Sequence, residues 1–384
     1  MTNPHQPLPA GRTLGGQGLG NRVELHPKRR ALRIGALVSA IALVLAACGD
    51  GDGAASAEGD AGSDADGAVE LVTYDAFVLD DEAAAAFAAE SGREVALLQQ
   101  GDAGSMTTRA VLSAGNPEAD VLFGVDNTLL ARALEADLFE PLPDDVLDLV
   151  PERYRVEGAG GDRVVAVDTG QVCVNADSAW FEEEGLEPPD TLEDLADERY
   201  RGLLVTENAA ASSPGLAFLL GTIAHFGEDG WQDYWERLVA NDVRIAADWS
   251  DAYEAAYSVS GGDRPLVVSY GSSPPAEVVY SEGERTEPQS AVIESTCVEQ
   301  VEYAGVLAGT ERPEAARELV RFLLSDDFQR SIPLSNFVFP IQDVETPEVF
   351  EQFAVKASDP LRLDADEIAT KRDRWTEEWR AITG

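Results

Sequence analysis

Short runs of apolar and β-branched residues alternate with segments of helical character from residue 69 onward. The runs that predict strands lie at residues 70–74, 94–98, 120–124, 203–206, 244–246 and 266–269. The segments that predict helices lie at residues 81–90, 106–114, 127–136 and 313–324, with further helix in the C-terminal region. Strands that alternate with helices of about ten residues are typical of βαβ units. The pattern therefore predicts an α/β fold with a largely parallel sheet.

Two longer extended runs lie outside this alternation. One begins at residues 164–167 and continues into residues 173–175, and the other covers residues 297–307. Two α/β series joined by two extended runs predict two lobes with a hinge of paired crossover strands. In such a structure ligands bind in a central cleft, where strand ends and helix starts face each other. We expect one lobe to contain residues 69–167 and 303–342, and the other residues 168–302 and 343–384.

The first 47 residues have the pattern of an export signal. Lys28, Arg29 and Arg30 precede an almost wholly apolar stretch at residues 34–47, and Cys48 follows. An apolar stretch of this length behind a basic flank is too short to span a membrane and is typical of a secretory signal. The sequence Leu-Ala-Ala before Cys48 resembles a bacterial lipobox, which implies cleavage before this cysteine and lipidation of its thiol. A chance cysteine after an ordinary signal is the alternative.

The segment after Cys48 and the charge of the chain bear on its partners. Residues 49–67 contain only Gly, Asp, Ala, Ser and Glu, so we expect residues 48–68 to be an acidic flexible tether on the outer face of the cell membrane. The chain has 28 Lys and Arg against 71 Asp and Glu, a formal net charge of -43. A chain this acidic repels the phosphates of nucleic acids, which excludes nucleic acid as a partner.

Few side chains are available for metal or cysteine chemistry. His225 is the single histidine beyond the predicted signal peptide, so we expect no metal site, and we expect no cofactor. Cys173 and Cys297 are the cysteines that remain once Cys48 is lipidated, and two cysteines of an exported chain usually pair. We predict a disulfide between them that ties two distant segments together. A reactive thiol is the alternative.

Candidate ligand-binding residues lie at the ends of predicted strands and at a helix start. They are Tyr74, Asp75, Asp126, Asn127, Ser212, Ser213, Trp249, Tyr270, Ser272 and Phe337. Aromatic faces and carboxylates attract organic cations, and each ring contributes about 0.5–2 kcal/mol. The sequence Ser-Ser-Pro at residues 212–214 predicts a helix start, whose exposed N–H groups favour an anion such as phosphate. A cleft with both features suits a cationic ring that carries a phosphate tail.

Each of these residues also has a purely structural interpretation. Tyr74 and Tyr270 could pack at the edge of the core, because aromatic residues favour strands. Asp126 with Asn127, and Ser212 with its neighbours, could simply cap the helices that follow them. The remaining large aromatic residues at helical spacing are expected to pack in the core or on helix faces; they are Trp231, Trp235, Trp375 and Trp379. His225 is expected to lie on a solvated helix.

From about residue 69 to the C-terminus, an ordered set of short motifs resembles the periplasmic thiamine-binding proteins of bacterial ABC importers. The motifs include Tyr74-Asp75-Ala76-Phe77, Gly124-Val125-Asp126-Asn127, Ser213-Pro214-Gly215-Leu216, Trp249-Ser250-Asp251-Ala252-Tyr253 and Leu266-Val267-Val268-Ser269-Tyr270. This group belongs to the type II periplasmic binding proteins, which also include ferric-ion and polyamine binders. The resemblance implies the two-lobed fold and a substrate-binding lipoprotein, not an enzyme, that delivers thiamine or its phosphates to a membrane permease. We expect a monomer.

The resemblance also implies roles for individual residues. Tyr74, Trp249 and Tyr270 would sandwich the thiamine rings, Asp126 would face the cation, and any phosphate would lie beside Ser212. Three aromatic positions of the family differ in this chain, which has Asp81 or a neighbour for a tryptophan, Ala276 for a tyrosine and Phe337 for a tryptophan.

Three further functions stay open within this fold: ferric-ion binding, polyamine binding and enzymatic cleavage of thiamine. Ferric-ion binders usually present two adjacent tyrosines as oxygen donors, whereas Tyr270 is followed by Gly271. Polyamine binding is the related possibility. Thiaminase I resembles the transport proteins in fold and cleaves thiamine with a cysteine nucleophile, which would require a free thiol at Cys173 or Cys297.

Overall fold

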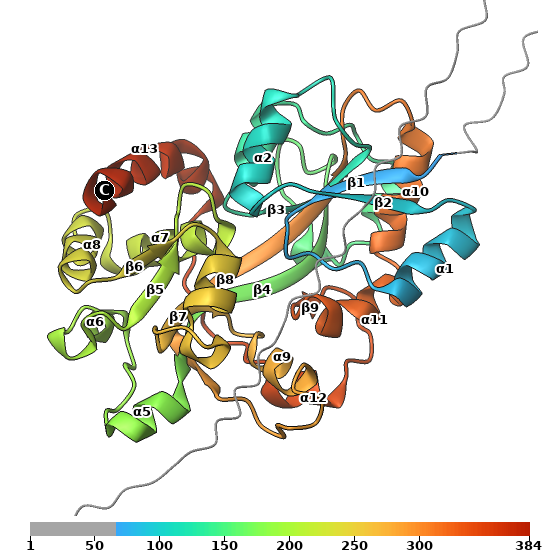
Figure 1. Cartoon of the computed structure of the whole chain (residues 1–384). Helices are drawn as coiled ribbons and strands as arrows, with labels where there is room; N and C mark the ends of the chain where they lie inside the picture. Colours follow the sequence, from blue (N-terminus) through green and yellow to red (C-terminus); the bar gives the residue numbers. More distant parts are fainter. Residues whose placement is uncertain (1–66) are drawn as a thin grey trace, which may run out of the picture. The chain divides into compact units, whose positions relative to one another are not determined.

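The computed structural model describes residues 67–384 of the 384-residue chain (Figure 1). The predicted signal peptide, the predicted lipidation site at Cys48 and nearly all of the predicted tether lie outside the described residues. Within residues 67–384, no helix has the length and apolar character needed to cross a membrane.

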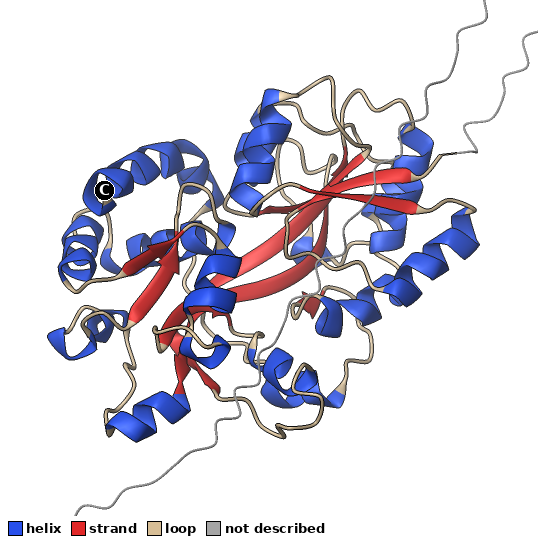
Figure 2. Ribbon diagram, viewed as in Figure 1, coloured by secondary structure: helices blue, strands red, loops and turns tan. Residues whose placement is uncertain are grey.

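In the described residues, nine strands form one mixed sheet with helices packed around it (Figure 2). The strands are β1 (Val69–Thr73), β2 (Val95–Gln99), β3 (Val121–Asp126), β4 (Val165–Asp177), β5 (Leu204–Glu207), β6 (Arg244–Ala246), β7 (Leu266–Tyr270), β8 (Ser290–Val306) and β9 (Phe339–Pro340). Their order across the sheet is β2-β1-β3-β8-β4-β7-β5-β6, and β9 pairs with β4.

The sheet has a parallel group of strands at each end. β1 pairs in parallel with β2 and β3, and we call these three strands the first strand group. β5 pairs in parallel with β6 and β7, which form the second strand group. The long strands β4 and β8 pair antiparallel with each other between the groups, and each is also antiparallel to its outer neighbour (Figure 1). The predicted α/β fold with two connected series is confirmed. The sheet is less parallel than predicted, because the central strands β4 and β8 run antiparallel to each other and to their outer neighbours. The residue bounds of the two lobes stay a prediction.

Thirteen α-helices lie in the described part of the chain. They are α1 (Asp81–Ser91), α2 (Ala103–Leu112), α3 (Leu130–Glu135), α4 (Asp144–Leu147), α5 (Ser178–Glu184), α6 (Leu192–Leu195), α7 (Ser213–Phe226), α8 (Trp231–Ala240), α9 (Pro274–Val279), α10 (Pro313–Leu323), α11 (Asp326–Ser335), α12 (Glu348–Phe353) and α13 (Ala365–Thr383). A π-helical segment, Asp251–Ala256, follows β6.

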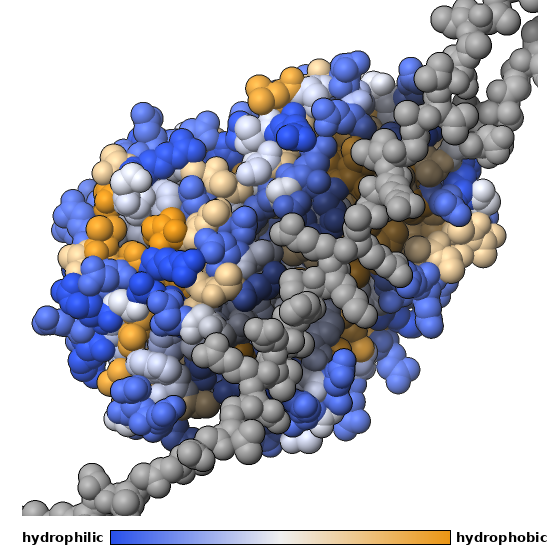
Figure 3. Space-filling view, in the orientation of Figure 1, coloured by the Kyte–Doolittle hydropathy of each residue, from blue (hydrophilic) through white to orange (hydrophobic). Residues whose placement is uncertain are grey.

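The core covers both faces of the central strands. Every residue of β3 and of β4 is buried, as expected for strands covered on both sides. The four tryptophans at helical spacing are also buried, and the ring of Trp235 meets the rings of Phe218 and Trp379 edge-on. His225 is exposed on α7 and lies 2.8 Å from a carboxylate oxygen of Glu193. The packing interpretation of these tryptophans is therefore confirmed. The face of the molecule shown in Figure 3 is mostly hydrophilic, with scattered hydrophobic residues.

A disulfide joins the two central strands. Cys173 on β4 and Cys297 on β8 are both fully buried, and their sulfur atoms are bonded at 2.06 Å. The bond connects residues that are 124 positions apart in the sequence. The predicted pairing is confirmed, and neither cysteine offers a free thiol in this structure.

Candidate functional site

A cavity of about 440 Å³ lies between the two strand groups. Its walls come from the end of β1, the start of α2, the N-terminus of α7, residues 248–254, the end of β7, α9, β8 and the segment after α11. Six of the ten sequence-predicted ligand residues line it, namely Tyr74, Asp75, Ser213, Trp249, Tyr270 and Phe337. The structure therefore brings the four predicted aromatic residues together around one cavity, and their role in ligand binding stays a prediction.

Two stacked rings form one wall of the cavity. Trp249 and Tyr253 lie 4.9 Å apart between ring centroids, with planes only 12° apart. The indole N–H of Trp249 donates a hydrogen bond of 3.0 Å to Ser269 Oγ, which fixes the orientation of the ring. The π-helical turn at Asp251–Ala256 carries Tyr253, and such turns are frequent at functional sites. Tyr253 was not predicted from the sequence, although it belongs to the same motif as Trp249.

Tyr74 is positioned by a glycine on the neighbouring strand. Gly124 on β3 has φ 102, a conformation that favours glycine, and a β-bulge interrupts the pairing with β8 at this point. A Cβ atom at Gly124 would lie 2.5 Å from the ring of Tyr74. The missing side chain of Gly124 therefore makes room for the aromatic ring at the cavity.

Three carboxyl groups form a row across β3, β8 and β4. Asp126 is paired with Glu302 in the sheet, and Glu302 is paired with Asp168 on its other side. All three side chains are buried. Burial penalises the charged form, which raises the pKa of Glu302 well above its usual value and that of Asp168 to about 8. The nearby charges of Asp168 and Asp126 raise the pKa of Glu302 further. The pair therefore retains a proton near neutral pH.

Glu302 is the acid of this row that lines the cavity. The hydroxyl of Tyr74 donates a 3.1 Å hydrogen bond to Glu302 Oε2, and Tyr270 lies close enough for the charge of Glu302 to raise the pKa of its phenol, after the larger effect of burial. Sequence reasoning missed Glu302, although a glutamate within an apolar strand run is itself a signal. Glu302 can supply the negative charge that an organic cation in this cavity requires.

Asp126, the predicted partner of the cation, does not line the cavity. Its Oδ1 accepts hydrogen bonds from the backbone N–H groups of Thr128 and Leu129, at 2.9 and 3.1 Å. Its Oδ2 accepts from Ser213 Oγ and from Gln300 Nε2. These contacts match the capping interpretation, and they also hold Ser213 in the cavity wall.

Asn127 and Ser272 lie outside the cavity as well. The side-chain oxygen of Asn127 accepts a 2.9 Å hydrogen bond from the backbone of Val301, so this residue ties its turn to β8. Ser272 is fully buried, and the neighbouring Ser273 lines the cavity in its place.

The N-terminus of α7 already faces a carboxylate. Ser212 caps this helix, as predicted, but it is buried and does not line the cavity. Asp102, the N-cap of α2, accepts hydrogen bonds from the backbone N–H groups of Ser213 at 3.0 Å and of Trp249 at 3.3 Å. Thus the position predicted for a ligand phosphate is occupied here by a carboxylate that connects the two strand groups. Sequence reasoning did not identify Asp102.

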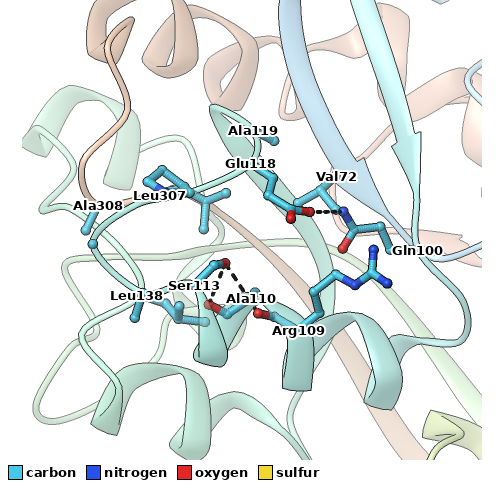
Figure 4. Close-up of a pocket in the computed structure, with 13 residues that line it drawn as sticks. Val72, Gln100, Arg109, Ala110, Ser113, Glu118, Ala119, Leu138, Leu307 and Ala308 are labelled. Atoms are coloured by element: carbon cyan, nitrogen blue, oxygen red, sulfur yellow. Dashed lines mark hydrogen bonds between the residues drawn. The ribbon is translucent and has the colours of Figure 1, made fainter.

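A second depression lies beside α2 and is shown in Figure 4. Val72, Leu138 and Leu307 line it, and Gln100 Nε2 donates a 3.0 Å hydrogen bond to Glu118 at its rim. Its volume of about 20 Å³ suffices for a water molecule. The cavity between the strand groups is therefore the better candidate for a ligand site.

Two strand groups connected by two long strands, with a cavity between them, define a solute-binding protein. Residues 116–371 match the family of bacterial extracellular solute-binding proteins, and the chain belongs to this family. It is 29% identical over 319 residues to the thiamine-binding periplasmic protein of Salmonella typhimurium, covering 82% of this chain and 93% of the relative. A solved periplasmic thiamin binding protein superimposes with a TM-score of 0.73 at 28% identity, over 84% of this chain and 98% of its own. Iron uptake protein A1 of Synechocystis is 25% identical over 299 residues, covering 74% of this chain and 79% of its own.

Proposed function

We propose that this protein captures thiamine, or its phosphate esters, outside the cell membrane and delivers it to the permease of an ABC importer. The observation that carries the proposal is that Tyr74, Trp249 and Tyr270 line the same cavity as the buried carboxyl group of Glu302. The similarity to thiamine-binding periplasmic proteins supports it independently.

The chemistry of the cavity suits a flat cation. Thiamine combines an aminopyrimidine with a positively charged thiazolium ring, and both rings present flat faces to aromatic side chains. Cation–π contacts contribute about 0.5–2 kcal/mol each once water is excluded. A carboxylate in the same cavity adds a charge-assisted contact, and no covalent step is needed for capture and release.

Ferric-ion binding is less compatible with these groups. Hard Fe³⁺ sites need ionised oxygen donors, and a tyrosine must lose its proton to serve as one. Burial instead raises the pKa of Tyr74 and of Tyr270, and the carboxyl group of Glu302 adds to this effect. Neutral phenols suit an organic ligand better than a metal ion.

A thiaminase-like reaction is disfavoured by the disulfide. Cysteine-based cleavage of thiamine needs a thiolate in the cavity. Cys173 and Cys297 are bonded to each other, and neither lines the cavity. We therefore propose a binding protein and not an enzyme.

The proposed location follows from the sequence of the first 68 residues. We propose that residues 1–47 are removed as a signal peptide, that Cys48 is lipidated, and that residues 48–68 tether the folded part to the outer face of the membrane. The folded part would then act as a monomer of two lobes, with residues 69–167 and 303–342 in one lobe and residues 168–302 and 343–384 in the other.

Isothermal titration calorimetry tests the ligand assignment. The purified protein is titrated with thiamine, thiamine monophosphate, thiamine diphosphate, ferric ion and spermidine. We expect saturable heat with at least one thiamine form and none with ferric ion or spermidine. Trp249→Ala should weaken thiamine binding by about 1–3 kcal/mol, because it removes a stacked ring. Leu112→Ala, at a residue that is 84% exposed and outside the cavity, is the control and should bind normally. Heat with spermidine but not with thiamine would contradict the proposal.

A further inference from the structure

Tyr280 lines the cavity and yet is 68% exposed. It follows the last residue of the short helix α9, whose first two prolines are buried. Because most of this ring is exposed at the rim of the cavity, its burial contributes little to folding. Its ring is therefore available to a ligand.

The ring of Tyr280 meets a ring from the opposite side of the cavity. Phe337 follows α11, which packs near α1 and α10, whereas Tyr280 follows β7 and α9. The two ring centroids are 5.5 Å apart in an edge-to-face arrangement. The pair thus bridges the cavity between segments that belong to the two ends of the sheet.

Phe337 is held in place by the residue before it. Asn336 accepts a 2.9 Å hydrogen bond from the backbone N–H of Val78 and donates one of 3.0 Å to the carbonyl of the same residue. Phe337 itself has φ 53°, a left-handed conformation that is unfavourable for a non-glycine residue. The hydrogen bonds of Asn336 therefore tie the backbone next to Phe337 to the segment after β1, whereas Tyr280 lies at an exposed helix end.

A small residue precedes Tyr280 by one helical turn. Ala276 lies four positions earlier and also lines the cavity. Alanine ends at its methyl group, so Tyr280 is the large side chain that this end of α9 presents to the cavity. A flat ligand in the cavity can therefore lie against the ring of Tyr280.

We propose that Tyr280 is a specificity-determining residue that covers the outer face of a flat organic cation in the cavity, with Phe337 beside it. This inference rests on the proposed function and adds a contact that the sequence motifs do not assign. The ring of Tyr280 slows escape of the ligand, because dissociation requires the Tyr280–Phe337 contact to separate.

Two substitutions at Tyr280 test this role. Tyr280→Ala removes the ring, Tyr280→Phe keeps it and removes only the hydroxyl, and Leu112→Ala again serves as an exposed control. Thiamine affinity is measured by calorimetry, and the dissociation rate by stopped-flow tryptophan fluorescence. We expect Tyr280→Ala to weaken binding about tenfold, mainly through faster dissociation, with Tyr280→Phe and Leu112→Ala within about twofold of the wild type. The melting temperature without ligand should stay the same in all four proteins, because the ring is exposed.

Three results would overturn the inference. Wild-type affinity and dissociation in Tyr280→Ala would show that the ring does not touch the ligand. An equal loss in Tyr280→Phe would assign the effect to the hydroxyl and not to the ring. A lower melting temperature of ligand-free Tyr280→Ala would indicate a structural role. If the wild-type protein itself binds no thiamine, the proposed function fails together with this inference, whereas the other three outcomes leave the proposed function intact.

Discussion

Replacing Glu302 by glutamine separates the charge of the cavity wall from its shape. Glutamine has nearly the same size as glutamate, and its side-chain oxygen can still accept the hydrogen bond from the hydroxyl of Tyr74. The change removes one ionisable group from the cavity wall, which also contains Asp75, Asp102, Asp248 and Glu254, and Asp168 stays behind it on β4. If the ligand is a cation held by this carboxylate, Glu302→Gln should weaken binding.

The expected loss follows from the electrostatics of a buried site. An ion pair at about 4 Å is worth about 4 kcal/mol at an effective dielectric constant of about 20. Desolvation of the two charges offsets part of this, and hydrogen bonds to charged groups typically contribute about 1.5–3 kcal/mol. We therefore expect the thiamine dissociation constant of Glu302→Gln to rise about 10- to 100-fold.

The pH dependence gives the sharper test. The pKa of Glu302 and of Asp168 is raised, that of Asp168 to about 8, so the unliganded pair carries a proton at neutral pH. A bound cation favours the ionised pair, and binding must then release this proton. Wild-type affinity should rise with pH between about 6 and 9, by at most about tenfold per pH unit for one proton. The difference between the wild type and Glu302→Gln should be small at pH 6 and large at pH 8.5.

Calorimetry in two buffers of different ionisation enthalpy measures both the affinity and the released proton. The control is Glu299→Gln, a partly exposed glutamate on the same strand that pairs with Arg362 outside the cavity. It should leave the affinity and the proton release unchanged. An unchanged affinity of Glu302→Gln with the same pH profile as the wild type would refute the assignment of Glu302 as the partner of the cation.

Two further predictions concern stability. Replacing Cys173 and Cys297 together by serine removes the covalent link between residues that are 124 positions apart. The free energy of unfolding, measured by chemical denaturation, should fall by about 2–5 kcal/mol. A loss below about 1 kcal/mol would contradict a structural role for the disulfide. Glu207 is fully buried with no hydrogen-bond partner for either carboxylate oxygen among the described residues, and burial, with Asp102 and Asp248 nearby, raises its pKa. The folded protein therefore keeps a proton that the unfolded chain loses above about pH 4.3, so stability falls as pH rises toward the folded pKa. Glu207→Gln has no ionisable group at this position and therefore avoids this loss of stability at high pH. Its melting temperature should exceed that of the wild type at pH 8 but not at pH 4. Equal melting temperatures of the two proteins at both pH values would contradict the argument.

The six strands of the two strand groups could be predicted well, because each is a short apolar run with a clear start and end. The prediction was less accurate for β8, which begins at Ser290 and not at residue 297. Its first residues alternate between buried and exposed positions and gain their strand conformation from pairing with β4, a contact that only the folded chain provides. Similarly, α3 begins at Leu130, because Asp126 binds the backbone N–H groups of the preceding turn.

The candidate site was harder to predict because side-chain direction depends on register. Residues at strand ends could be assigned to one edge of the sheet, which was sufficient for Tyr74, Trp249 and Tyr270. The assignment of the acidic residue depended on two β-bulges, one in β3 between Phe123 and Val125 and one in β4 between Ala166 and Asp168. A bulge shifts the alternation of buried and exposed faces by one residue, and no local pattern announces it.

The disulfide and the strand pairing explain how the sheet tolerates two acidic residues opposite each other at its centre. Glu302 and Asp168 lie on the same two strands that the disulfide joins a few positions further along. Between these points, the hydroxyl of Thr169 donates a 2.8 Å hydrogen bond to the carbonyl of Gln300, which holds β4 against β8. Because the covalent bond and the ladder keep the strands together, the like charges cannot relax by separating, and either a proton or a cation must neutralise them. A positively charged ligand next to Glu302 would relieve this repulsion. The pair that destabilises the ligand-free protein at high pH would therefore strengthen binding of a cation at the same pH.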